Sequence, residues 1–104
     1  MSRANPERGE ASLTVGGETL LLRPSFEALV AAEEEIGPLI ALVERAAAGG
    51  LKLDEMARLF WHCAHDRPAG LTRQAIGAAI AERGLVSASP VLKVLLGQIL
   101  QGHG

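Results

Sequence analysis

The sequence predicts an α+β fold that is predominantly α, with an N-terminal β-hairpin followed by a compact bundle of about five short helices. A Gly-Gly pair near the N-terminus separates two stretches in which apolar and polar residues alternate. After it, Gly and Pro divide the chain into short segments whose apolar residues recur at helical spacing. The composition is 48% hydrophobic but only 3% aromatic, so the core must consist mainly of Leu, Ile, Val and Ala.

The chain length predicts one domain. It has 104 residues, within the commonest size range of single domains. Residues 1–9 are polar and include Pro6 and Gly9, which favours a flexible N-terminal tail. We therefore expect a single domain over residues 10–104.

The hairpin is expected over residues 11–23, with Gly16-Gly17 as its two-residue turn. In this register Val15 faces Glu18, and the next pairs on the same face are Leu13 with Leu20 and Ala11 with Leu22. The opposite face carries mostly polar residues, as a half-buried ribbon requires. Those residues are Ser12, Thr14, Thr19, Leu21 and Arg23.

Five helices are expected at about residues 25–36, 38–48, 53–65, 72–83 and 90–101. The first helix should bury a stripe of Phe26, Leu29, Val30 and Ile36. Small polar residues, Gly and Pro mark the helix ends. The expected N-terminal residues are Ser25, Pro38, Thr72 and Ser89-Pro90, and the expected C-terminal stops are Gly37 and Gly84.

The charge and hydropathy of the sequence argue against nucleic acid and membranes as partners. Ten basic and twelve acidic residues give a net charge of −2, and the basic residues form no cluster, which argues against nucleic acid. No apolar run approaches the roughly 20 residues needed to cross a bilayer, and the start of the chain lacks the apolar segment of a signal peptide. Cys63 is the only cysteine, so we expect a reducing, cytoplasmic location and no cofactor.

One polar cluster, His62-Cys63-Ala64-His65-Asp66, contains metal-ligand and nucleophile types. Adjacent helical positions point apart, so Cys63 should be a buried, inert thiol and the histidines solvated, with His62 pairing with Asp66 one turn later. No catalytic or metal-binding residue is assigned, and a small metal or thiol enzyme is the remote alternative.

Glu33 is predicted to fall within the apolar stripe of the first helix, whereas Glu35 points the opposite way. A carboxylate among apolar groups is costly unless it is paired. We expect an internal ion pair with Arg45 or Arg58. A contact with a partner protein and a shallower stripe are the alternatives.

The final helix has more apolar surface than a helix packed on one face needs. Its apolar residues cover about two-thirds of its circumference. The helix is therefore either central in the fold or a surface that binds a partner. The candidate partner-binding residues are Leu92, Leu95, Leu96, Ile99 and Leu100.

Residues 20–37 resemble the small gene transfer agent family proteins that are encoded with the tail genes of alphaproteobacterial phage-like particles. The shared pattern is a strand ending in Leu22-Arg23-Pro24, then Phe26-Glu27-Ala28-Leu29 and a Glu-rich helix that ends at Gly37. A weaker similarity extends over roughly residues 10–100. Members are described as tail assembly chaperones or as tail-tube components, so the resemblance implies no catalytic residue.

Two main functional hypotheses follow. The first is an assembly chaperone that holds the tape-measure protein, or another tail protein, through an apolar helix surface. The second is a structural subunit of the tail that self-associates, through the hairpin edges, into a homo-oligomer and stays in phage-like particles.

Overall fold

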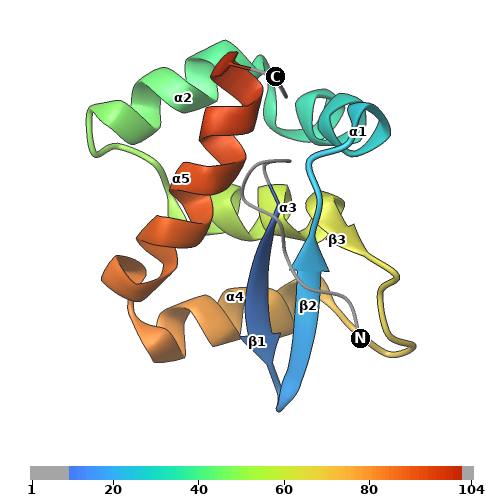
Figure 1. Cartoon of the computed structure of the whole chain (residues 1–104). Helices are drawn as coiled ribbons and strands as arrows, with labels where there is room; N and C mark the ends of the chain where they lie inside the picture. The colour runs from blue at the N-terminus through green and yellow to red at the C-terminus, as the bar shows by residue number, and fades with distance from the viewer. Residues whose placement is uncertain (1–9, 102–104) are drawn as a thin grey trace.

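The computed structural model describes residues 10–101, and the expected tail at residues 1–9 lies outside them. A three-stranded antiparallel sheet has the order β1-β2-β3. In Figure 1 the hairpin stands in front of α3 and α4, α5 runs beside it, and α1 and α2 lie beyond one end. The elements are β1 Ala11–Val15, β2 Glu18–Leu22, α1 Phe26–Ile36, α2 Leu39–Ala47, α3 Leu53–Cys63, β3 Ala64–His65, α4 Arg73–Arg83 and α5 Leu85–Gln101. The predicted fold class is confirmed.

The hairpin has the predicted register. Leu13 pairs with Leu20, and the turn residues Gly16 and Gly17 have φ angles of 57° and 84°. A two-residue turn of this kind needs positive φ at both positions, which glycine adopts without a steric penalty. The buried face carries Ala11, Leu13, Val15, Leu20 and Leu22, as expected.

The third strand was not expected. Helix α3 ends at Cys63, not at residue 65, because Ala64 is extended, with φ −64° and ψ 118°. Ala64 and His65 then pair with Leu22 and Leu21 of β2. The backbone N–H of Arg23 also donates to the Cys63 carbonyl at 2.7 Å. This short strand satisfies backbone groups along the second edge of β2.

The helix caps of α1 and α4 are confirmed. Ser25 Oγ accepts the Ala28 N–H at 3.2 Å, and Thr72 Oγ1 accepts the Ala75 N–H at 3.1 Å. Each hydroxyl satisfies an N–H that has no acceptor within its own helix. Gly84 ends α4 with a φ of 87°.

Helix α5 begins five residues earlier than predicted, at Leu85 instead of Pro90. The Ala88 N–H donates to the Gly84 carbonyl at 3.3 Å, so the first turn forms directly after α4. Pro90 removes one backbone donor inside the helix. Ser89, expected as a cap, instead donates its hydroxyl to the Leu85 carbonyl at 3.2 Å.

The core is aliphatic, as the composition predicts, with Phe60 as its one fully buried aromatic side chain among the described residues. Apolar side chains from the hairpin, from β3 and from helices α1 to α5 meet there. The largest of them are Phe60, Leu13, Leu22, Leu42, Leu59, Ile76, Ile80 and Leu95.

Candidate functional site

The cluster His62 to Asp66 does not form one site. His62 bonds to Glu35 of α1 and not to Asp66, with its Nε2 2.7 Å from Glu35 Oε1. The prediction that His62 pairs with Asp66 was therefore wrong. The prediction that His62 is solvated was also wrong, because its side chain is only 13% exposed. His65 is the residue that lies near Asp66, with 3.3 Å between Nε2 and Oδ2.

Cys63 is a buried thiol, as predicted, and 1% exposed. Burial raises the pKa of the Cys63 thiol to about 12, so the thiol is protonated at neutral pH and is a poor nucleophile. Within residues 10–101, no group of three His, Cys, Asp or Glu side chains is arranged to hold a metal ion.

Glu35 is the centre of a charge cluster that joins three helices. Besides His62, it pairs with Arg73 of α4 and with Arg58 of α3, whose Nε lies 3.4 Å from Glu35 Oε2. Arg58 also reaches Asp54 at 3.0 Å. The hydrogen bond from His62 lowers the pKa of Glu35 most, burial opposes it, and Arg73 lowers it further. The cluster ties α1 to α3 and α4.

Glu33 has a different role from the one predicted. It is exposed, and its Oε2 accepts the Leu39 N–H at the start of α2 at 3.1 Å. The two expected partners are engaged elsewhere, because Arg45 pairs with Glu55 and Arg58 with Glu35 and Asp54. The prediction that Glu33 forms an internal ion pair with Arg45 or Arg58 was therefore wrong.

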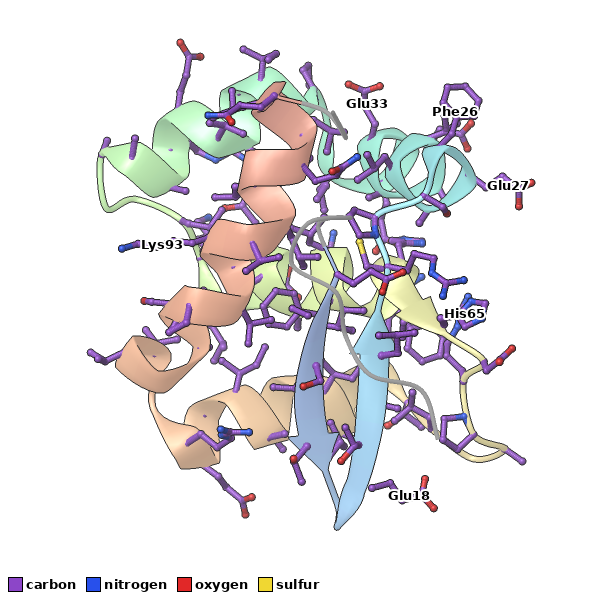
Figure 2. The ribbon with its side chains drawn as sticks, viewed as in Figure 1. Glu18, Phe26, Glu27, Glu33, His65 and Lys93 are labelled. Carbon is purple, nitrogen blue, oxygen red and sulfur yellow. The ribbon has the colours of Figure 1, made fainter. Side chains whose placement is uncertain are left out.

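The orientation of α1 explains this error. Ala32 is fully buried, whereas Phe26 is 81% and Val30 is 37% exposed. The helix therefore packs through Ala32, Leu29 and Ile36, and two members of the predicted stripe face outward. Figure 2 shows Phe26, Glu27 and Glu33 projecting away from the rest of the molecule.

The candidate residues of α5 divide into two groups. Leu92 and Leu95 belong to the core, with 9% and 0% exposure, and so do not form a free surface. Leu96 and Ile99 are partly buried, and Leu100 is 57% exposed. Much of the surplus apolar surface predicted for this helix is thus covered by the protein itself.

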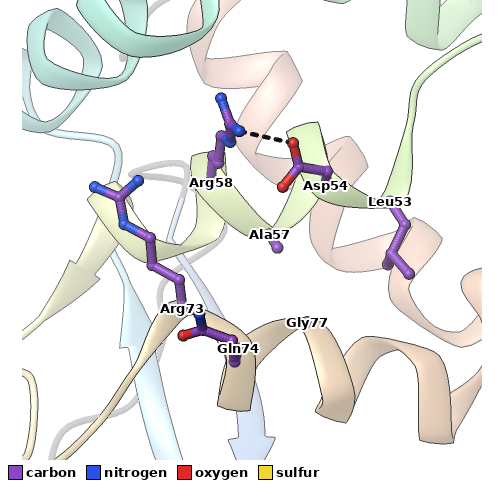
Figure 3. A pocket seen from close by; sticks show the side chains of 7 residues that line it. All are labelled: Leu53, Asp54, Ala57, Arg58, Arg73, Gln74 and Gly77. Carbon is purple, nitrogen blue, oxygen red and sulfur yellow. Dashed lines mark ion pairs between the residues drawn. The ribbon is translucent and has the colours of Figure 1, made fainter.

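A groove of about 540 Å³ lies between α3 and α4 (Figure 3). Its two arginines are already engaged with carboxylates, Arg58 with Asp54 and Glu35, and Arg73 with Glu35. The lining therefore presents a neutralised set of charges and no activated nucleophile. It consists of Leu53, Asp54, Ala57, Arg58, Arg73, Gln74 and Gly77.

Two further contacts involve arginines outside the Glu35 cluster or at its edge. Glu10 is buried and pairs with Arg23, whose Nε lies 2.8 Å from Glu10 Oε2. Trp61 carries Arg67 over its ring, 4.3 Å from the centroid, and Arg73 at 5.6 Å. The Glu10–Arg23 pair continues the hairpin register, in which Ala11 faces Leu22, whereas the contact between Arg73 and Trp61 depends on how α4 packs against α3.

The fold and the surface define a small α+β protein in which a charge cluster links three helices and several large apolar side chains are exposed. The model of the family described as phage tail tube protein, GTA-gp10, matches residues 8–102, and the chain belongs to this family. The predicted resemblance to gene transfer agent and phage tail proteins is thereby confirmed. No curated protein and no solved structure matches the chain.

Proposed function

We propose that the protein is a non-catalytic component of a phage-like tail that acts by binding other tail proteins and stays in the particle as a structural subunit. Membership in a tail-tube family is the observation that carries this proposal. Within residues 10–101, seven large apolar side chains that are exposed on the helices provide contact sites for such partners. These are Phe26, Val30, Ile40, Leu53, Leu85, Val86 and Leu100.

These side chains favour helical surfaces over the hairpin edge as contact sites. They lie on helices α1, α2, α3 and α5. Strand β1 pairs with β2 along one edge, and both α4 and α5 contact β1. Self-association through the hairpin, which the sequence suggested, has less support than association through the helices.

A tail assembly chaperone is the second candidate, and the end of α5 favours it. Leu100 is 57% exposed, and the partly buried Leu96 and Ile99 lie one turn or less away. Such a ridge can bind an apolar helix of the tape-measure protein reversibly and without ATP.

In the described part of the chain, no helix is long and apolar enough to span a membrane.

Particle composition separates the two candidates. Quantitative mass spectrometry of purified tail particles should find the chain in fixed stoichiometry with the other tail proteins if it is a subunit. A chaperone should instead copurify with the tape-measure protein from cells and be absent from finished particles. A chain found in neither fraction would contradict both.

Two substitutions in α5 test its role. Leu100→Asp should leave the free energy of unfolding within about 0.5 kcal/mol of the original, because the side chain is exposed. Leu96→Asp should cost about 1–3 kcal/mol, since it places a charge against the core. If α5 binds the tape-measure protein, Leu100→Asp abolishes co-elution with it on a size-exclusion column. Unchanged co-elution would remove α5 from the interface.

A further inference from the structure

The outer face of α1 combines apolar and acidic side chains in an ordered way. We define this face as Phe26, Glu27, Val30, Glu33 and Glu34, all of them exposed. At about 100° per residue, Phe26 and Val30 lie at neighbouring angles with Glu33 on one side and Glu27 and Glu34 on the other. The result is an apolar ridge with a carboxylate border on both sides.

Among the residues that the structure describes, the carboxylates of this face have no cationic side chain as a partner. Helix α1 contains no Lys or Arg, and no ion pair of the described residues involves the three carboxylates of the face. Arg58 and Arg73 bind Glu35, which lies on the opposite side of α1. Within residues 10–101 the outer face of α1 therefore carries unpaired negative charge.

We propose that the outer face of α1 binds an amphipathic helix of another tail protein, one whose apolar stripe is bordered by Lys and Arg. The proposal rests on the proposed function and specifies the chemistry of the partner. Phe26 and Val30 supply the apolar contact, and Glu27, Glu33 and Glu34 attract the basic border of the partner and set its register.

The geometry favours a helical partner. Helix α1 has 11 residues and is about 16 Å long, which matches about three turns of a second helix packed against it. An extended peptide needs a free strand edge for backbone hydrogen bonds, and a helix has none to offer. Anionic lipid and nucleic acid would both be repelled by the three carboxylates.

The first test uses two designed helical peptides of about 18 residues that share one leucine stripe and differ only at its border, which is Lys in one and Glu in the other. Binding to the full-length protein is followed by fluorescence anisotropy of a labelled peptide. The Lys peptide should bind at least about tenfold more tightly than the Glu peptide, and added salt should reduce the difference. The substitution Phe26→Ser should weaken binding of the Lys peptide by about tenfold or more.

A charge reversal gives the sharper test. The variant Glu27→Lys/Glu34→Lys should bind the Glu peptide in preference to the Lys peptide. The control Glu18→Lys/Glu82→Lys changes the net charge equally at exposed positions on β2 and α4, so it should keep the original preference. Circular dichroism verifies that each variant is folded.

The outcomes are distinct. Equal binding of the two peptides, no binding of either, or a reversal produced equally by the control variant would each overturn the proposal for α1. The proposed function would survive any of these results if the protein still copurified with tail proteins or particles. Loss of fold in Phe26→Ser would show that Phe26 is a core residue, and would also overturn the proposal.

Discussion

The hairpin and helix α1 lie next to each other in the sequence, yet only the hairpin has the buried face that its sequence predicts. In the hairpin, Leu13, Leu20 and Leu22 are all buried, as their alternation indicates. In α1, Ala32 is buried and Phe26 is 81% exposed, so the largest apolar residue lies outside the core.

The difference follows from the geometry of the two elements. A strand has only two faces, so a correct turn fixes which residues are buried. A helix can rotate about its axis, and its orientation depends on what it packs against. In α1 the small side chain of Ala32 faces inward together with Glu35, whose partners lie on α3 and α4. The contrast therefore separates residues that stabilise the fold from residues that are available to a partner.

The largest effect is expected in the hairpin. Leu22 is completely buried in β2, and Leu22→Ala should lower the free energy of unfolding by about 2–5 kcal/mol through lost burial and the remaining cavity. Urea denaturation followed by circular dichroism measures it. A cost below about 1 kcal/mol would show that the hairpin is not part of the core.

A smaller effect is expected on the inner face of α1. Glu35→Gln removes the charge that His62, Arg58 and Arg73 share, and should cost about 1–2 kcal/mol because the carboxylate is partly exposed and screened by water. Glu34→Gln, one residue earlier on the outer face, is the matched control and should change stability by less than about 0.5 kcal/mol. Equal effects of the two variants would contradict the assigned orientation of α1.

The contribution of Glu35 should also depend on pH. Its pKa in the folded protein lies below the ordinary value of 4.5, mainly because of the hydrogen bond from His62. The folded state therefore favours the charged form, so the stabilisation is present above pH 4.5 and is lost as the pH falls through the lowered pKa. The stability difference between the original protein and Glu35→Gln should shrink as the pH falls below about 4.5. A stability difference that grows in acid would contradict the lowered pKa of Glu35 in the folded protein.

The smallest effect on stability is expected on the outer face of α1. Phe26→Ser should change the free energy of unfolding by no more than about 0.5 kcal/mol, because the ring is already in contact with water. The same denaturation assay applies. A loss comparable to that of Leu22→Ala would place Phe26 in the core and remove the contrast between the two regions.

Local signals in the sequence were sufficient for much of the fold. The register of the hairpin depends on Gly16-Gly17, and the caps Ser25 and Thr72 depend on bonds spanning three residues, so both could be predicted. Strand β3 has only two residues, too few to show a period. The start of α5 was misplaced because Pro90 is typical of a first turn but here lies inside the helix.

The site was harder to predict because its contacts join distant parts of the chain. The Glu35 cluster joins residue 35 to residues 58, 62 and 73 on two other helices. Which of the consecutive glutamates faces inward depends on the rotation of α1, and no local pattern fixes that rotation. The error at Glu33 and the missed role of Glu35 therefore have the same origin.

Size-exclusion chromatography with multi-angle light scattering tests most directly whether the protein acts by binding other tail proteins. The chain is analysed alone and after co-expression with the tape-measure protein and with the other tail proteins. The account predicts a defined homo-oligomer or a stable complex with at least one of them, and weaker assembly for Phe26→Ser. A monomer under every condition, with no tail protein co-eluting, would contradict it.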